Sequence, residues 1–242
     1  MEEISQAART GLHPAEGREV KTTGSTLFWR SKVAAFDRRL RQVLKHSDVV
    51  TPGTRWLDVG CGYGELLLAA RQLLPHDAHF TGIEPSVIKR RFAASHGLTL
   101  LDTPLEEIPP ASFDVVSIIN VISHVPDPVS FLQQVVRVLP PGGLLLLVTG
   151  NGADIERLEF PEALNLPDHL IFFGESGLIA LLEKCHFDVL SVDKFKTFFI
   201  EPFYLRMLKN VARRILRRPV VAPNRGAHRS LFVRARKQSS TL

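Results

Sequence analysis

The sequence has little cysteine and no long apolar run. Cys61 and Cys185 are its two cysteines, too few for a disulfide framework and without the spacing of metal ligands. Apolar runs such as Leu144–Val148 fall far short of the roughly 20 residues that a membrane span needs. The first ten residues, MEEISQAART, are polar and partly acidic, unlike a secretory signal or an Arg-rich transit peptide. These absences predict a protein of the reducing cytoplasm without a bound metal.

Acidic residues are missing from the last part of the chain. Of the 30 Lys and Arg residues, 11 lie between Pro202 and Leu242, where there is no Asp or Glu. The remaining 19 share the first 201 residues with all 25 Asp and Glu side chains. The body of the protein is therefore mildly acidic. Any argument for binding a polyanion or an anionic membrane must rest on the basic segment 206–218.

From residue 26 onward, apolar runs alternate with amphipathic helical patterns. This alternation predicts an α/β fold, with a mainly parallel sheet covered by helices on both faces. Residues 1–25 show no sustained period, and we expect them to be loosely ordered. We expect residues 26–242 to form a single domain, with a basic amphipathic helix inserted at about 201–219. The expected strands are 55–60, 79–85, 98–102, 113–122, 142–150, 187–195 and 230–237, and the other expected helices are 26–46, 65–74, 86–97, 127–139 and 175–185.

The stretch WLDVGCGYGELL, residues 56–67, places three alternate glycines between an expected strand and an expected helix. Glycine has no Cβ, so a turn built from Gly60, Gly62 and Gly64 can approach a ligand closely at the carboxyl end of its strand. The next expected strand ends in Glu84, whose carboxylate can accept both hydroxyls of a ribose. The two features together predict a nucleoside-containing ligand.

Two classes of nucleoside cofactor compete for this turn. A dinucleotide fingerprint needs G-x-G-x-x-G, but Glu65 stands at the position of its third glycine. A carboxylate there would repel a pyrophosphate, and Asp58 adds a second negative charge just before the loop. An acidic loop suits a ligand that carries an amine and a sulfonium. The spacing therefore favours S-adenosyl-L-methionine over a dinucleotide.

LDVGCGYGEL, followed by GIEPS, LLDTPLEEIP, FDVVSIINVISHVPDP and LPPGGLLLLVTG, resembles the class I S-adenosylmethionine-dependent methyltransferases. Within them it is similar to the small-molecule branch that resembles the enzymes of ubiquinone biosynthesis, over roughly Phe28 to Lys194. The resemblance implies a Rossmann-like, doubly wound sheet of seven strands, mostly parallel with an antiparallel last strand. It also implies a methyl donor, S-adenosyl-L-methionine, and a hydroxyl or an activated carbon of a small or lipid-linked molecule as the acceptor.

The resemblance also assigns roles in cofactor binding. The glycine stretch meets the methionine side, Glu84 the ribose, Asp102 and Thr103 the adenine, and Asn120 the methyl end. Trp29 and Arg30 resemble an aromatic and basic pair that caps the cofactor carboxylate in some members. The complete implied set is Asp58, Gly60, Cys61, Gly62, Gly64, Glu84, Pro85, Ser86, Asp102, Thr103, Asn120, Trp29 and Arg30.

Two histidines are candidates for removing a proton from the acceptor. In the family resemblance, His124 faces the site, although Ser123 precedes it where many relatives have Glu. His169 lies in LPDHLIFF, which resembles the segment before a helix that covers the substrate, and it is slightly preferred. Each histidine could instead simply pack the turn in which it lies. Phe172 and Phe173 could line an apolar pocket or belong to the core.

The basic segment and the missing carboxylate beside His124 leave other functions open. The segment 206–218 could touch an anionic membrane from the cytoplasmic side, clamp an anionic acceptor, bind RNA phosphates, or pack on the end of the sheet. The alternatives to a small-molecule methyltransferase are a regulatory protein that binds the cofactor or a membrane without turnover, and an RNA methyltransferase. The residues NVIS after the expected fourth strand disfavour N-methylation of adenine or cytosine, and no sequence-specific contact with nucleic acid is expected.

Overall fold

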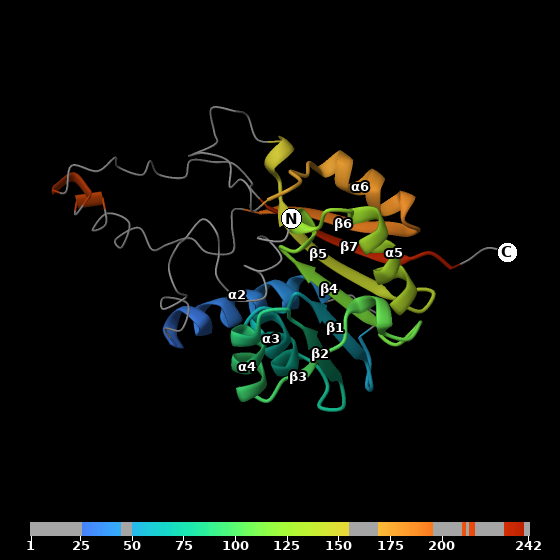
Figure 1. Cartoon of the computed structure of the whole chain (residues 1–242), viewed down its shortest axis with the longest axis horizontal. Coiled ribbons are helices and arrows are strands. Elements are labelled where there is room, and N and C mark those ends of the chain that lie inside the picture. The colour runs from blue at the N-terminus through green and yellow to red at the C-terminus, as the bar shows by residue number, and fades with distance from the viewer. Residues whose placement is uncertain are drawn as a thin grey trace.

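The computed structural model describes residues 26–44, 50–154, 169–195, 210–211, 213–215 and 230–239. Its centre is a seven-stranded sheet in the order β3-β2-β1-β4-β5-β7-β6 (Figure 1). Strand β7 runs antiparallel to both β5 and β6, and the other neighbouring strands pair in parallel. The predicted mostly parallel sheet with an antiparallel last strand is confirmed. The strands are β1 (Arg55–Val59), β2 (His79–Ile83), β3 (Thr99–Leu101), β4 (Val115–Ile119), β5 (Leu144–Gly150), β6 (Phe187–Phe195) and β7 (Ser230–Lys237).

Helices cover both faces of this sheet, as the sequence pattern predicts. Helices α2, α3 and α4 lie on one face, and α5 and α6 lie on the other (Figure 1). Short 3₁₀ turns follow β3, β4 and β5. The helices are α2 (Thr26–Leu44), α3 (Glu65–Leu73), α4 (Val87–Ser95), α5 (Pro128–Val138) and α6 (Glu175–Lys184), and the turns are η1 (Leu105–Glu107), η2 (Ile122–His124) and η3 (Gly152–Asp154).

Local chemistry explains where two of these helices begin and end. Asp127 precedes α5, and its carboxylate accepts hydrogen bonds from the backbone N–H groups of Val129 and Ser130. Ser86 precedes α4, but its hydroxyl makes no hydrogen bond to the helix. Gly97 follows the end of α4 with φ +74°, a left-handed conformation that suits glycine at this position.

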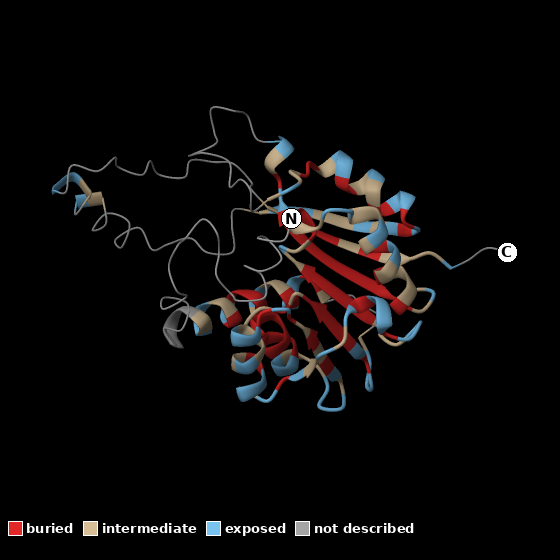
Figure 2. Ribbon diagram, viewed as in Figure 1, coloured by how far each residue is buried: buried red, intermediate tan, exposed pale blue. Residues whose placement is uncertain are grey.

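The apolar runs form two cores, one on each face of the sheet. The inner strands are buried on both sides, so their sequences are nearly continuous in apolar residues rather than alternating (Figure 2). Trp56, fully buried, belongs to the core under α2 and α3, and Phe187, also fully buried, belongs to the core under α5 and α6. The strands thus form a rigid layer from which the loops at their carboxyl ends project.

The basic helix predicted at about 201–219 lies largely outside the described residues. Residues 210–211 and 213–215 are helical, in agreement with the prediction. Residues 1–25, predicted to be loosely ordered, also lie outside the described ranges. Within those ranges, no helix is both long enough and apolar enough to cross a membrane.

The sheet order places the candidate site at the carboxyl ends of the inner strands β1 and β4. From β1 the chain proceeds outward to β2 and β3, then returns to β4 on the other side of β1. At such a switch point the loops after the two neighbouring strands diverge, and ligands of doubly wound sheets bind in the crevice between them. Here those loops are the glycine loop, residues 60–64, and the turn after β4, residues 120–124.

Candidate functional site

The glycine loop connects β1 to α3 and is bent in the way that the alternate glycines predict. Gly60, Gly62 and Gly64 have φ values of +72°, +57° and +80°, a region that side chains rarely adopt. A Cβ atom on Gly60 would lie 2.4 Å from Cγ2 of Val121, in the turn after β4. The first glycine therefore permits the close approach of the two loops at the switch point.

The backbone N–H groups of this loop are already engaged within the protein. Those of Gly60 and Cys61 donate to the carbonyl of Ile83 at 2.8 and 3.0 Å, and that of Gly64 donates to the carbonyl of Cys61 at 2.9 Å. The N–H of Gly62 donates to Oε2 of Glu84 at 2.8 Å. A phosphate-binding loop directs its N–H groups at the ligand, whereas this one directs these four inward. The geometry agrees with the prediction that a dinucleotide is disfavoured.

Three buried carboxylates surround the loop. Asp58, Glu65 and Glu84 are 2%, 8% and 6% exposed. Glu84 accepts hydrogen bonds at both oxygens, because its Oε1 also receives the N–H of Ser86 at 2.9 Å. Lys32 on α2 lies 3.3 Å from Oε1 of Glu65 and brings a cation to the loop. The loop thus carries more negative than positive charge among these groups.

Asp58 is the carboxylate most affected by this environment. Burial raises its pKa to about 8, and the charges of Glu65 and Glu84 also raise it, while a hydrogen bond from Ser117 lowers it. Burial first, and the neighbouring carboxylates second, raise the pKa of the Cys61 thiol. Cys61 is therefore a neutral packing residue, and its contribution to the loop comes from its backbone.

The aromatic member of the predicted upstream pair reaches the loop. The indole N–H of Trp29 donates to the carbonyl of Tyr63 at 3.4 Å. The Trp29 ring also packs against Phe92 and His96 of the α4 region, with ring centroids 5.6 and 4.6 Å apart. Arg30 is exposed. Lys32, which residue pattern alone did not single out, lies one helical turn beyond Trp29 and contacts the loop instead.

The residues predicted for the far end of the cofactor are more exposed. Asp102 is exposed and forms an ion pair with Arg90 on α4, while Thr103 is half-buried. Pro85 is exposed, whereas Ser86 is fully buried and its hydroxyl has no hydrogen-bond partner. The roles predicted for Asp102 and Thr103 remain predictions.

Asn120 directly follows β4 in a left-handed conformation with φ +55°. Its N–H donates to the carbonyl of Val148 on β5 at 2.8 Å, which fixes the turn that leads toward His124. Asparagine tolerates this conformation better than most residues, but such backbone strain is concentrated at functional sites. Asn120 thus lies at the carboxyl end of β4, and its role near the reacting end of the site stays a prediction.

The structure brings the two candidate histidines together. The ring centroids of His124 and His169 lie 4.7 Å apart with an interplanar angle of 36°. The backbone carbonyl of Ser123 holds the second segment in place, because it accepts the N–H groups of Leu170 at 2.8 Å and Ile171 at 3.2 Å. Asp168, which precedes His169, lies outside the described residues.

The two neighbouring phenylalanines differ in burial and in the groups that they contact. Phe172 is half-buried, and its ring centroid lies 5.9 Å from that of His169. Phe173 is 7% exposed and belongs to the core under α5 and α6. Phe172 therefore extends the row of rings that begins at His124, whereas Phe173 serves packing.

The described part of the polar segment after β5, residues 151–154, is hydrogen-bonded to the chain around the start of α6. Asp154 accepts the N–H of Glu175 at the start of α6, at 2.9 Å, and the N–H of Ala153 donates to the carbonyl of Phe173 at 3.0 Å. Gly174 permits this contact, since a Cβ there would lie 2.2 Å from Oδ1 of Asp154. These bonds join residues 153–154 to the segment that leads into α6.

Comparisons with known proteins show that the chain is similar to methyltransferases. A family model described as a methyltransferase domain matches residues 28–192. The chain is 35% identical over 122 residues to a ubiquinone biosynthesis O-methyltransferase of Vibrio cholerae, covering 47% of this chain and 48% of the relative. The chain thus matches about half the length of this curated relative.

Solved structures share the fold at low identity. A phosphoethanolamine N-methyltransferase of Haemonchus contortus, solved with phosphomonomethylethanolamine and S-adenosylhomocysteine, aligns with TM-score 0.66 at 18% identity, covering 90% of this chain and 59% of that one. The [4+2]-cyclase SpnF aligns with TM-score 0.61 at 22% identity, covering 84% and 80%. The fold is therefore shared by proteins whose names describe different reactions.

Proposed function

Because the chain belongs to the family of methyltransferase domains, whose cofactor is S-adenosyl-L-methionine, we propose that it transfers a methyl group to a hydroxyl or an activated carbon of a small or lipid-linked acceptor. The observation that carries this proposal is the acidic glycine loop, with Glu84 bonded into it. His124 lies in the turn after the neighbouring strand β4. His169 lies in the segment that is hydrogen-bonded to the carbonyl of Ser123, and the two rings are paired. A cofactor site and a proton acceptor would thus flank one switch point.

The residues of the loop fit this cofactor. A Cβ on Gly62 would meet only Oε2 of Glu65, at 3.7 Å, so the loop leaves space at its middle glycine. Each oxygen of Glu84 accepts one N–H group, and a carboxylate has about four acceptor positions, so both oxygens can still accept ribose hydroxyls. The buried hydroxyl of Ser86, without a partner beside Glu84, is a further group that a polar ligand would satisfy.

The charges fit as well. Glu65 and Glu84, and Asp58 where it is ionised, favour a ligand that carries a sulfonium and an ammonium group, and they disfavour a pyrophosphate. Lys32, bound to Glu65, is suited to the single carboxylate of the cofactor. We assign Lys32 this role in place of the predicted Arg30. Trp29 contributes by holding α2 against the loop through the carbonyl of Tyr63.

When bound, the cofactor supplies a methyl group on a positively charged sulfur, which is already activated for displacement. The protein must then align the acceptor, exclude water and accept a proton where the acceptor is a hydroxyl. His169 and His124 offer ring nitrogens for that proton. The carbonyl of Ser123 keeps the two rings in register, and Phe172 provides an apolar surface next to His169.

A hydroxyl is the favoured acceptor within this proposal. A carbon acceptor does not need two histidines beside the site to the same degree, and the relative in Vibrio cholerae is named as an O-methyltransferase. Labelled methyl transfer from S-adenosyl-L-methionine into fractionated extract tests the proposal, with lipid, polar small-molecule and RNA pools counted separately. Label in the lipid or polar pool supports it, whereas label that disappears after RNase treatment favours the RNA methyltransferase. Cofactor binding without transfer into any pool favours a regulatory protein.

Cofactor binding is the minimum requirement of the proposal. Calorimetry should detect S-adenosyl-L-methionine binding to the intact protein, and Glu84→Ala or Gly62→Val should abolish it. Gly142→Ala is a matched control, because Gly142 lies in a turn before β5 and a Cβ there meets nothing within 4 Å. A folded wild-type protein that does not bind the cofactor would exclude the function proposed above.

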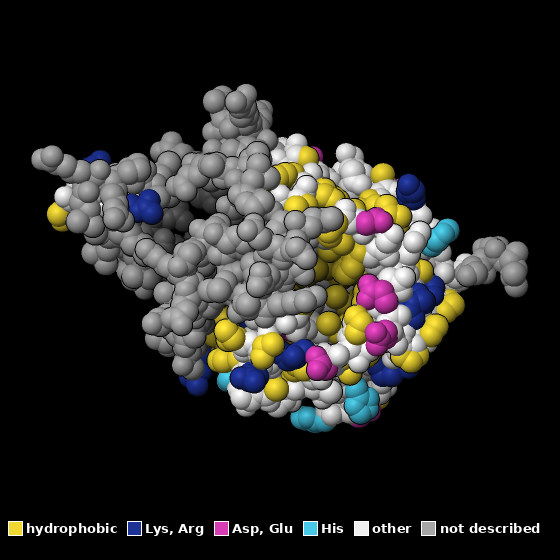
Figure 3. Space-filling view, viewed as in Figure 1, with side chains coloured by type: hydrophobic (Ala, Val, Ile, Leu, Met, Phe, Trp, Pro, Cys, Tyr) yellow, Lys and Arg dark blue, Asp and Glu magenta, His cyan; other side chains and the backbone are white. Residues whose placement is uncertain are grey.

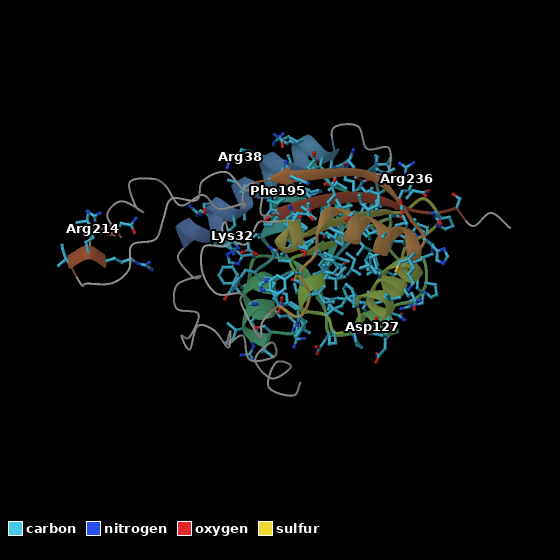
Figure 4. The ribbon with its side chains drawn as sticks, turned by 90° about the horizontal axis from the view of Figure 1, so that it is seen from above. Lys32, Arg38, Asp127, Phe195, Arg214 and Arg236 are labelled. Carbon is cyan, nitrogen blue, oxygen red and sulfur yellow. The ribbon has the colours of Figure 1, made fainter. Side chains whose placement is uncertain are left out.

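We also propose that the basic segment touches an anionic membrane surface. In its described part, Val211 and Ile215 are 49% and 76% exposed on one side of a helical stretch, rather than packed against the sheet. Arg213 and Arg214 stand beside them, and Figure 3 shows basic and hydrophobic atoms together on this stretch, while Figure 4 shows Arg214 well away from the sheet. Exposed aliphatic side chains gain from a bilayer but not from RNA phosphates.

Vesicle co-sedimentation tests this contact. Binding should require anionic phosphatidylglycerol, weaken with salt, and fall in the double variant Arg213→Glu/Arg214→Glu and in Ile215→Ser. Arg38→Glu, on the exposed side of α2, is a control that leaves binding unchanged. Equal binding to neutral and anionic vesicles would contradict the membrane assignment. Stronger binding to RNA than to anionic vesicles at the same salt concentration would contradict it as well.

A further inference from the structure

A chain of hydrogen bonds runs through the core to the carboxylate beneath the glycine loop. The indole N–H of Trp56 donates to Oγ of Ser117 at 2.9 Å, and the Ser117 hydroxyl donates to Oδ1 of Asp58 at 2.6 Å. Asp58 and Ser117 face each other in the register of β1 and β4. Trp56 and Ser117 are fully buried, and Asp58 is 2% exposed.

Trp56 determines where the Ser117 proton goes. Because the indole occupies an acceptor position of the hydroxyl, the single hydroxyl proton is left to donate. Its alternatives are Asp58, at 2.6 Å, and the carbonyl of Leu57, at a weak 3.4 Å. The short bond to a carboxylate is the stronger of the two, and donation to Ser117 from behind strengthens it further. The chain therefore favours the ionised form of Asp58.

The other groups that face Asp58 act in the opposite direction. Glu65 at the start of α3 and Glu84 after β2 are like charges, and burial removes the water that would stabilise a carboxylate. The thiol of Cys61 is neutral, and Lys32 of α2 binds Glu65. Burial and these charges raise the pKa of Asp58 to about 8, against the pull of Ser117. The charge of Asp58 near neutral pH thus depends on a balance in which the Ser117 bond is the favourable contribution.

We propose that Ser117 is a positioning residue for the cofactor, which orients Asp58 beneath the glycine loop, lowers the pH at which its carboxyl group ionises, and so sets the pH range in which the cofactor binds. The inference rests on the proposed function, because it concerns the same site. A cofactor with a sulfonium and an ammonium group binds better above an ionised Asp58 than above a neutral one. Cofactor affinity should therefore rise with pH until Asp58 is ionised in the free protein as well.

Loss of the Ser117 hydroxyl should shift the pH-dependent rise in cofactor affinity to higher pH. A hydrogen bond to a charged group is worth enough to change the ionisation of Asp58 by about one pH unit or more. Ser117→Ala should then weaken cofactor binding about tenfold at pH 7 and much less at pH 9. A merely structural role of Ser117 would weaken binding by the same factor at every pH.

Calorimetric titration with S-adenosyl-L-methionine from pH 6 to pH 9 tests this, on wild type and on Ser117→Ala. The amino group of the cofactor titrates near the same range, at about 7.7–8.0, but it does so equally for every variant. Asp58→Asn supplies the reference curve, since its pH dependence comes from the cofactor alone. The difference between each curve and this reference isolates the ionisation of Asp58.

A second pair of variants keeps the test independent of folding. Ser117→Ala leaves the buried indole N–H without a partner, so the double variant Trp56→Phe/Ser117→Ala removes both groups together. Trp56→Phe alone should shift the pH profile in the same direction by a smaller amount. Thermal unfolding of each variant establishes that it is folded at the temperature of the titration.

The outcomes separate this inference from the proposed function. If wild type does not bind the cofactor at any pH, the proposed function fails. If wild type binds but Ser117→Ala has the same pH profile, or is weaker by one constant factor at every pH, the inference about Ser117 is overturned. A profile displaced to higher pH in both Ser117→Ala and the double variant supports it.

Discussion

A single added methyl group at Gly64 should destabilise the fold, whereas the same change at Gly62 should chiefly block the cofactor. Gly64 has φ +80°, and a Cβ there would lie 2.1 Å from Cδ1 of Leu98 and 3.4 Å from Cβ of Ala93. The left-handed backbone costs a non-glycine residue about 1–2 kcal/mol. Overpacking of a filled core adds about 1–3 kcal/mol. Gly64→Ala should therefore lose about 2–5 kcal/mol of unfolding free energy.

The middle glycine carries only the first of these costs. Gly62 has φ +57°, and its added Cβ would meet only Oε2 of Glu65 at 3.7 Å. We expect Gly62→Ala to lose about 1–2 kcal/mol, from the backbone alone. The new methyl group would nevertheless occupy the space at the middle of the loop that the proposed function assigns to the cofactor. Cofactor affinity should then fall by far more than stability.

Gly53→Ala provides the matched control. Gly53 has φ +78° in the turn before β1, and a Cβ there has nothing within 4 Å. Urea unfolding measures the stability of the three variants, and each kcal/mol corresponds to roughly 2–4 °C in Tm for a domain of this size. Calorimetry measures cofactor binding. Equal losses of stability in Gly62→Ala and Gly64→Ala, or normal cofactor affinity in Gly62→Ala, would refute the assigned roles of the two glycines.

Three further predictions concern other parts of the site. Folding raises the pKa of Asp58 to about 8, so the folded protein holds its proton more tightly than the unfolded chain does, and stability without cofactor should fall as pH rises from about 4 to about 8. Asp58→Asn should flatten this decline in urea unfolding at pH 5 and pH 8, and an unchanged slope would contradict the burial argument. His169→Asn and His124→Asn should leave cofactor binding intact, but at least one of them should slow transfer to a hydroxyl by about 10²–10⁴-fold and change the acidic limb of the rate profile. If both variants keep full activity across the pH range, neither histidine takes the proton. Asp154→Ala should cost about 1 kcal/mol of unfolding free energy, because it removes the bond to the first N–H of α6, whereas Asp37→Ala, in an exposed pair with Arg41, should cost less.

The sequence predicts all seven strands, because each is an apolar or partly apolar run bounded by turn residues, and this holds for the largely exposed edge strand β6 as well as for the buried inner strands. The expected bounds of β6 and β7 agree with the structure at both ends, and the positive φ values of Gly60, Gly62 and Gly64 follow from their alternate spacing. These features depend on neighbours in the chain. Their chemistry can therefore be recognised without knowledge of the sheet order.

Contacts between distant segments were harder to predict. His124 and His169 were considered as alternatives, yet a backbone carbonyl at Ser123 brings them together across 45 positions of sequence. Lys32 meets Glu65 only because α2 packs on α3. Ser117 is the one polar residue in the apolar run VVSII, which marks it as unusual. Only the register of β1 and β4, which places it opposite Asp58, shows why it is polar. Such pairings depend on the sheet order, which the residue pattern alone does not provide.

The insertion of β7 between β5 and β6 has a consequence for how the protein is assembled during synthesis. Strand β6 is complete at residue 195, but its partner begins only at residue 230, and β7 is also the outer neighbour of β5. Until β7 arrives, β5, with its apolar run Leu144–Val148, has one unpaired side, and β6 lacks the strand that pairs with it in the described part of the chain. Open strand sides of this kind are templates for pairing with other chains. A ribosome that pauses between these two strands would therefore leave the nascent chain with open strand sides and prone to aggregation.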